Sequence, residues 1–149
     1  FYYGAGHTKI YLEKMCEFYS RLSDIKYTAF RHSNIYGPYD KYDLEKSHVT
    51  GATITKVMTS KDGKVNVWGS GEELYNVGLG KGIKIKDLVR KVIINSGKDL
   101  EMVHDLSKPT VPTSLFLDCS KAKKELGWKP KHSLDQGLQK TINWYKKNF

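Results

Sequence analysis

A histidine and a lysine, eight residues apart, are the first side chains in this sequence whose types and spacing could do chemistry. His48 follows a charged segment, residues 42–46, and precedes an apolar-periodic stretch. An imidazole exchanges protons near neutral pH, so it suits general acid–base catalysis. In a helix that begins at Ser47, Lys56 would lie about two turns further on and on roughly the same side, where its ammonium could offset phosphate charge. The alternatives are a solvated histidine at a helix start and an ordinary surface lysine.

Alternating helical and strand-like stretches must position these residues. Apolar periodicity predicts helices over residues 8–22, 47–59, 83–97, 120–128 and 133–148. Short apolar or alternating runs predict strands over residues 25–30, 65–68, 74–80, 100–105 and 114–118. Gly97 and Gly127 should end helices, and Ser133 with Gln136 forms a capping-box pattern. This alternation predicts an α/β fold.

Composition and charge limit the classes of function. The 149 residues are 39% hydrophobic, enough for a folded domain, and no window approaches the apolar length of a membrane span. The net charge of +9 is scattered, so we interpret it mainly as a solvated surface; the alternative is attraction for an anionic ligand. Cys16 and Cys119 show neither a disulfide framework nor metal-ligand spacing, which favours a reducing, cytoplasmic setting. His7, His32, His104 and His132 show no metal-ligand spacing either.

The order of several motifs resembles the C-terminal half of the extended short-chain dehydrogenases/reductases, NAD(P)-dependent enzymes that remodel nucleotide-activated sugars. The motifs are TKIYLEKMCEFYS, RHSNIYGPYDKYDLEKSHV, VNVWGSGE, YNVGLGKGIKIKDLV, DLSKP and LDCSKAKKELGWKPKHSLDQGLQKTINWY. The run NIYGPYDKYDLEKSHV is most similar to the GDP-L-fucose synthase branch of the family. RHSN also resembles the sugar-nucleotide 4,6-dehydratases.

The resemblance implies the C-terminal part of a Rossmann-type fold joined to a smaller α/β substrate-binding domain. Residues 1–46 would be the C-terminal remnant of the Rossmann domain, with the catalytic-lysine helix, a strand and a loop. Residues 47–149 would be mainly the substrate-binding domain. The family's glycine-rich first half has no counterpart in this sequence, and the segment GLGKG is expected to be a turn. A further family segment, which carries an arginine, is lacking near residues 73–75.

The resemblance also implies catalytic roles. Lys9 matches the lysine that lowers the pKa of a tyrosine four residues earlier and binds the ribose of NADP or NAD, but that earlier position holds Ala5. We therefore expect this chain alone to be inactive. His48 matches the acid that acts in epimerisation beside a 4-keto group. Its companion in the branch is a cysteine from the half without a counterpart, and neither Cys16 nor Cys119 matches it.

Four side chains match positions that contact ligands in the family. Asn34 corresponds to a residue near the nicotinamide and the substrate phosphates, and Lys56 to a basic substrate contact. Trp68 could stack on a base, and Lys108 aligns with a substrate-side lysine. The alternatives are a turn asparagine, two surface or linker lysines and a core tryptophan.

The function implied is an NADPH-dependent 3,5-epimerase/4-reductase of a GDP-4-keto-6-deoxyhexose. One alternative is a sugar-nucleotide 4-epimerase or 4,6-dehydratase that recycles bound NAD. An alternative from another class is a non-catalytic fragment that binds a nucleotide sugar or another anion. The expected partners are a nucleotide-diphosphate sugar and a second copy of the chain in a homodimer, with neither nucleic acid nor membrane.

Overall fold

The computed structural model describes residues 3–76, 78–110 and 115–149, and the chain separates into two compact units, Phe1–Arg31 and His32–Phe149. Residues 32–46, which we assigned to the Rossmann remnant, form part of the second unit. Tyr42 shows why: its ring is buried in the core of that unit, and its carbonyl accepts a hydrogen bond from Thr55 Oγ1 at 2.7 Å. The assignment of the units to a Rossmann and a substrate-binding domain stays a prediction.

The first unit consists of helix α1 (Tyr3–Tyr19) and the chain that follows it. The helix begins five residues before the predicted range 8–22 and ends three residues before its end. None of the residues in α1 is buried, and a bidentate ion pair between Glu13 and Arg31, at 2.7 and 2.5 Å, ties the following segment back to it. The strand predicted over residues 25–30 is wrong, because none of the described strands pairs with that segment.

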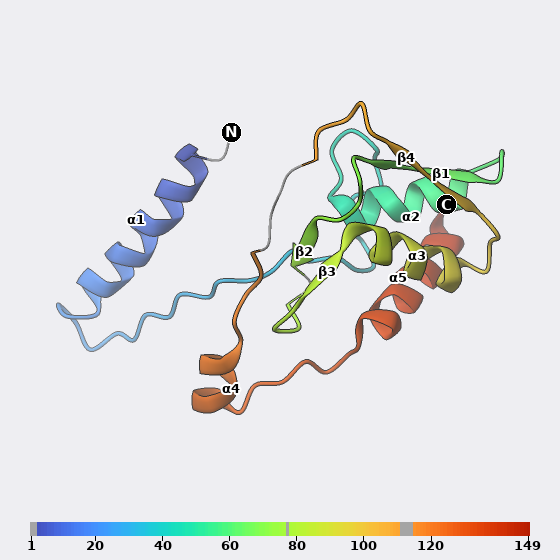
Figure 1. Ribbon diagram of the computed structural model, residues 1–149. Coiled ribbons are helices and arrows are strands. Elements are labelled where there is room, and N and C mark those ends of the chain that lie inside the picture. The colour runs from blue at the N-terminus through green and yellow to red at the C-terminus, as the bar shows by residue number, and fades with distance from the viewer. Residues whose placement is uncertain (1–2, 77, 111–114) are drawn as a thin grey trace. The chain divides into compact units, whose positions relative to one another are not determined.

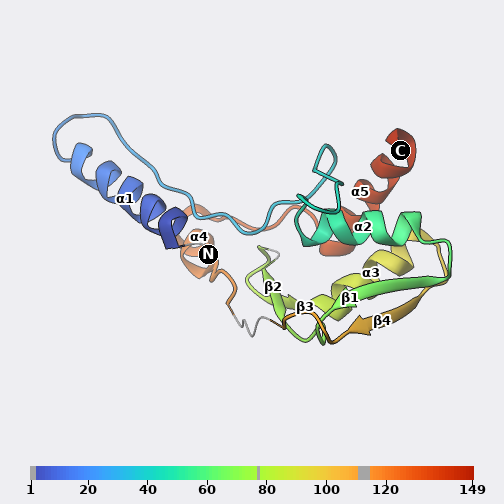
Figure 2. The same cartoon turned by 90° about the horizontal axis from the view of Figure 1, so that it is seen from above.

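The second unit contains a parallel strand pair and three packed helices. Its elements are α2 (Val49–Thr59), β1 (Lys64–Trp68), β2 (Leu74–Asn76), β3 (Gly82–Lys84), α3 (Ile85–Ser96), β4 (Glu101–Asp105), α4 (Ser120–Leu126) and α5 (Leu134–Asn148). Strands β1 and β4 pair in parallel from Lys64 opposite Glu101 to Trp68 opposite Asp105. Strands β2 and β3 pair antiparallel. Figures 1 and 2 both place α3 between the β1–β4 pair and α5, with α2 beside it.

The core of this unit lies where α2, α3 and α5 meet the inner face of β1. Strand β1 alternates exposed and buried residues, so Val65 and Val67 point into the core and Trp68 points out. The largest fully buried apolar side chains, Ile54, Val57, Leu88, Val92, Leu138 and Ile142, come from the three helices. Burial of these periodic faces is what holds helices of this length in place.

Local signals set the ends of these elements. The capping box of Ser133 and Gln136 forms as predicted, and Gly97 and Gly127 end α3 and α4 in the left-handed conformation at φ 74° and 62°. The helix predicted over 47–59 is confirmed by α2, which begins at Val49, and the strands at 65–68 and 100–105 are confirmed by β1 and β4. The strand predicted over 74–80 is wrong for residues 78–80, because the chain turns there, and the helix predicted from residue 83 begins at Ile85, because residues 82–84 pair with β2 as β3. The strand predicted over 114–118 is wrong for residues 115–118; position 114 lies outside the described residues. Among the described helices, none combines the length and apolarity needed to cross a bilayer.

We predict that Ile142→Ala will lower the free energy of unfolding by about 2–5 kcal/mol, because it leaves a cavity at a fully buried position of α5. The matched control is Ile94→Ala on α3, where the side chain is 76% exposed and the expected change is below about 0.5 kcal/mol. Urea unfolding followed by circular dichroism measures both. Equal effects of the two substitutions would contradict the position of the core.

Candidate functional site

A groove of about 450 Å³ opens within the second unit, between α2, the end of β1 and the loop that follows β1. Helix α2 contributes Val49, Thr53 and Lys56 to one wall, and β1 contributes Trp68 to another. Pro109, beyond the end of β4, closes a third side. The groove therefore forms where the outward-facing end of β1 meets α2.

The structure brings together three of the residues predicted from the sequence: Lys56, Trp68 and Lys108. The Lys56 and Lys108 ammonium groups lie 5.4 and 5.6 Å from the centroid of the Trp68 ring, which is cation–π distance. Trp68 is 60% exposed, so it is not a core tryptophan. Two cations beside an exposed aromatic face make a surface suited to an anionic ligand with a flat ring.

Lys56 is held rather than freely solvated. Its Nζ donates a hydrogen bond to the carbonyl oxygen of Asn66 at 3.2 Å, across from α2 to β1. Burial lowers the pKa of the Lys56 ammonium, because the partly desolvated charge is less stable than in water. An anion in the groove would restore the stabilisation that this charge loses on burial.

His48 lies at the rim of the groove, as the N-cap residue of α2. Its neighbours Ser47 and Val49 line the groove. The His48 carbonyl accepts the hydrogen bond of Ala52 N at 2.9 Å, but its side chain makes no capping hydrogen bond. The exposed imidazole is thus not used to cap the helix, and eight residues separate it from Lys56, about 12 Å along the helix axis.

Asn34 is not among the described residues that line the groove. Lys9 belongs to the first unit, where it is exposed on α1 four residues after Ala5. One helical face thus carries the predicted lysine and an alanine methyl group where a phenol would be needed. Asn34 is exposed in the extended segment that leads into the second unit. Both assignments stay predictions.

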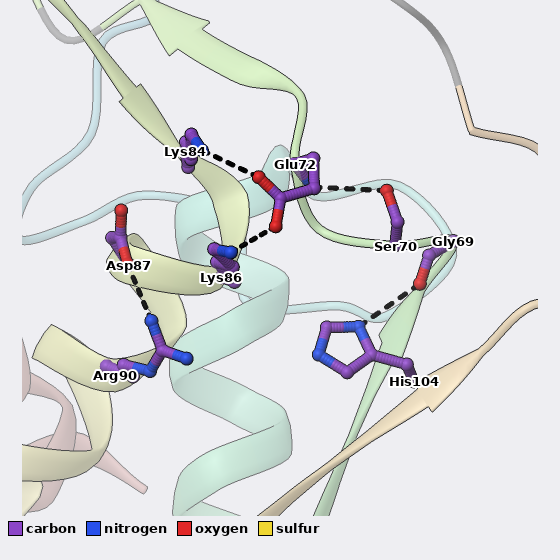
Figure 3. Close-up of polar contacts among 8 residues, drawn as sticks. All are labelled: Gly69, Ser70, Glu72, Lys84, Lys86, Asp87, Arg90 and His104. Carbon is purple, nitrogen blue, oxygen red and sulfur yellow. Dashed lines mark hydrogen bonds and ion pairs between the residues drawn. The ribbon is translucent and has the colours of Figure 1, made fainter.

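The loop after β1 is fastened on both sides, and Figure 3 shows the polar contacts that hold it. Gly69 N donates to Asp105 O at 2.9 Å, and Lys86 N donates to Gly71 O at 2.8 Å. His104 Nδ1 lies 3.2 Å from Gly69 O, which ties the loop to β4 as well. The loop therefore presents its side chains to the groove from a fixed backbone.

Glu72 also stabilises this loop, because it forms ion pairs with two lysines. Its carboxylate accepts hydrogen bonds from Lys84 Nζ at 2.7 Å and from Lys86 Nζ, as Figure 3 shows. These two donors lower the pKa of Glu72 from 4.5 to about 2. The ion pairs link the loop to the end of β3 and the start of α3.

Gly69 allows the loop to turn directly after Trp68. Its φ is +64°, in the region that disfavours side chains. A Cβ added there would lie 2.6 Å from Thr110 Oγ1 and 3.2 Å from Glu73 Oε1. The absence of a side chain thus lets Glu73 approach the backbone next to the tryptophan.

Glu73 and Ser47 are among the groove residues that were not predicted from the sequence. Glu73 is the second of two adjacent glutamates, and sequence offers no reason to separate it from Glu72. Ser47 Oγ is buried and has no hydrogen-bond partner among the described residues, a signal that only coordinates reveal.

Within residues 3–76, 78–110 and 115–149, no group of histidine, cysteine and acidic side chains could hold a metal ion. Cys16 and Cys119 are free and half-buried, rather than fully buried as core thiols would be. The glycine-rich segment at 78–82 joins the antiparallel strands β2 and β3, so it is a hairpin turn as predicted and not a dinucleotide-binding turn.

Comparison with known proteins identifies the family. Residues 3–81, more than half of the chain, match the NAD dependent epimerase/dehydratase family. The chain therefore belongs to that family. It is 32% identical to a probable GDP-L-fucose synthase of Oryza sativa, over 91% of this chain and 49% of that protein. It is 29% identical to a GDP-L-colitose synthase of Yersinia pseudotuberculosis, over 95% of the chain and 56% of the relative. A putative UDP-glucose 4-epimerase of Methanocaldococcus jannaschii is 26% identical, over 96% of the chain and 53% of the relative.

Solved structures show the same fold. The UDP-glucose 4-epimerase of Thermotoga maritima, solved with UDP-glucose, superposes with a TM-score of 0.75 at 27% identity, over 95% of this chain and 51% of that one. The GDP-L-fucose synthetase of Naegleria fowleri bound to NADP gives a TM-score of 0.69 at 17% identity, over 77% and 43%. The second likeness speaks for the fold alone.

The chain spans about half the length of the curated relatives that it matches. The match to the rice relative also extends over 163 residues, whereas 91% of 149 residues is about 136. The relative thus carries residues inside the matched region that have no counterpart here. That the lacking segment falls near residues 73–75 stays a prediction.

We predict that Glu72→Gln will destabilise the protein at pH 7 and flatten the pH dependence of its unfolding below pH 4.5. The folded-state pKa of Glu72 lies below its usual value, so its contribution is fully present above about pH 4.5 and is lost as pH falls through about 2. Urea midpoints at pH 7, 4.5 and 2.5 measure the effect. Glu101→Gln is the control, because that carboxylate is exposed and lies 3.9 Å from Lys64. Identical midpoints for the wild type and Glu72→Gln at every pH would contradict the prediction.

Proposed function

We propose that this chain supplies the substrate-binding part of an enzyme that remodels a nucleotide-diphosphate sugar, most specifically a 3,5-epimerase/4-reductase of a GDP-4-keto-6-deoxyhexose that uses NADPH. The observation that carries the proposal is the exposed ring of Trp68 in the groove, with the groove residue Lys56 on it and Lys108 approaching the same ring from the segment after β4. Membership of the family and the 32% identity to a probable GDP-L-fucose synthase support the same conclusion.

Four side chains in and near the groove have physical roles in this proposal. The Lys56 and Lys108 ammonium groups offset the two phosphate charges of the ligand. Trp68 offers a flat apolar surface on which a base can stack. The 4-keto group acidifies the neighbouring C–H bonds, so that a base, a cysteine from the family's other half, removes a proton there. His48, exposed at the start of α2, then donates a proton to the same carbon from the opposite face.

A nicotinamide dinucleotide, NADP or NAD, is the cofactor that the family implies. The glycine-rich segment at 78–82 does not serve as its phosphate-binding turn, because it lies in the hairpin between β2 and β3. Lys9 and Asn34 are the proposed contacts, Lys9 to the ribose. Hydride transfer in the family requires further cofactor-binding residues besides Lys9 and Asn34.

A second enzyme function has its own support. The Thermotoga maritima UDP-glucose 4-epimerase, at 27% identity, and the putative Methanocaldococcus jannaschii 4-epimerase favour a reaction in which bound NAD is recycled. The same groove would then hold a nucleotide sugar without net reduction. A 4,6-dehydratase belongs to this recycling class.

A non-catalytic role is the alternative from a different class. The net charge of +9 could hold a nucleotide sugar or another anion without any reaction. Binding of random DNA that weakens steeply with salt, with no preference for GDP, would favour this alternative.

The homodimer predicted from the sequence stays a proposal, as does the cytoplasmic location. Helix α1 supports the homodimer, because the apolar side chains Ile10, Tyr11, Leu12 and Phe18 are all more than half exposed on it. A second copy of the chain would cover such a surface.

We predict that Lys56→Ala and Lys108→Ala will each weaken GDP binding about tenfold, because each removes a cation from beside the Trp68 ring. Isothermal titration calorimetry on the 149-residue chain measures the affinities. Lys61→Ala is the matched control, an exposed lysine in the turn after α2 that neither lines the groove nor lies at cation–π distance from Trp68. Equal losses for all three variants would indicate a general charge effect and contradict the site.

We predict no NADPH oxidation by this chain with GDP-4-keto-6-deoxymannose, because Ala5 offers no phenol beside Lys9. Turnover is expected from a protein that joins the chain to a dinucleotide-binding half and carries Ala5→Tyr. Absorbance at 340 nm follows the reaction. Product formation without added NADPH would favour the recycling alternative, and failure to convert any nucleotide sugar would contradict both enzyme functions.

A further inference from the structure

Glu73 places a carboxylate in the same groove that Trp68 lines. The residue lines the groove and is half-buried. Its Oε1 lies 3.2 Å from the point where Gly69 would carry a Cβ, and Gly69 follows Trp68 in the chain. A negatively charged hydrogen-bond acceptor thus shares the groove with the aromatic ring that Lys56 and Lys108 flank.

The Glu73 carboxylate has no hydrogen-bond or ion-pair partner in the part of the chain that the structure describes. Glu72, one residue earlier, is paired with two lysines. A half-buried carboxylate that accepts no hydrogen bond from the described residues offers its acceptor positions to a ligand that donates hydrogen bonds.

The backbone around Glu73 is fixed. Its carbonyl accepts a hydrogen bond from Ile85 N at 2.9 Å, and Gly69 N donates to Asp105 O at 2.9 Å. The backbone that carries Glu73 is therefore anchored on both sides. A side chain that extends into a groove from an anchored backbone is suited to discriminate between ligands.

The hydrogen-bond donors on the edge of each base decide which base suits such a carboxylate. A base that stacks on Trp68 presents its edge to a neighbouring side chain, and a carboxylate can accept two hydrogen bonds side by side. Guanine has two adjacent donors on one edge, N1–H and N2–H₂. Adenine, cytosine and uracil present a donor beside an acceptor on the corresponding edge, and that acceptor would face the carboxylate.

We propose that Glu73 is the residue that selects guanine, by accepting hydrogen bonds from N1–H and N2–H₂ while the base stacks on Trp68. This inference rests on the proposed function, because it requires a nucleotide in the groove. In this proposal Lys56 and Lys108 bind the phosphates, and Glu73 binds the base. The second carboxylate of the groove wall, Glu45, is more exposed and serves as the matched control.

The test is calorimetric titration of the whole 149-residue chain with GDP, IDP, ADP and UDP. IDP differs from GDP only in lacking the N2 amino group. The wild type is expected to bind GDP about tenfold more tightly than IDP, and ADP and UDP more weakly still. Glu73→Gln should bring the GDP-to-IDP affinity ratio close to one. Glu45→Gln should keep the ratio of the wild type.

The ratio is the decisive quantity, because removal of a negative charge strengthens the binding of every phosphate ligand. Circular dichroism establishes that both variants are folded. Wild-type binding of GDP and IDP with equal affinity overturns the role of Glu73 but leaves the proposed function intact. Loss of the preference in Glu45→Gln instead of Glu73→Gln also overturns the assignment. Failure of the wild type to bind any of the four nucleotides overturns the proposed function itself.

Discussion

The parallel pairing of β1 with β4 is the constraint on which the candidate site depends. Parallel neighbours cannot be joined by a tight turn, so the chain between them must cross over, and here the hairpin β2–β3 and helix α3 make the connection. The pairing register ends with Trp68 opposite Asp105, and the next backbone hydrogen bond, from Gly69 N to Asp105 O, turns the chain into the groove wall. Without that pairing, neither the tryptophan nor the loop after it would have a fixed position.

The alternation of exposed and buried side chains along β1 determines which of them reaches the site. Val65 and Val67 face the core that α2, α3 and α5 complete, which leaves Trp68 on the outer side at the strand end. Lys56 reaches it from α2 and Lys108 from the segment after β4. Burial of the apolar face thus dictates where the cations and the aromatic ring meet, and the partial desolvation of Lys56 favours an anion there.

Local signals in the sequence predicted most of the second unit. The capping box at Ser133, the glycines at 97 and 127 and the periodic face of α5 act through neighbours in the chain, so they are legible without coordinates. The strands predicted at 25–30 and 114–118 failed over their described residues for the opposite reason. A strand is stable only with a pairing partner, and an alternating or apolar run does not state whether one is available.

The sequence by itself determined the α/β class, the family and the identities of Lys56, Trp68, Lys108 and His48 as candidates, because these follow from periodicity and from the order of motifs. Only the tertiary structure decided that the first three meet, since they come from a helix, a strand end and a segment after another strand. Only the tertiary structure distinguished the surroundings of Glu72 from those of Glu73. The two residues are identical and adjacent in the chain, but Glu72 pairs with two lysines and Glu73 lines the groove. That difference is created by long-range packing, which no local pattern encodes.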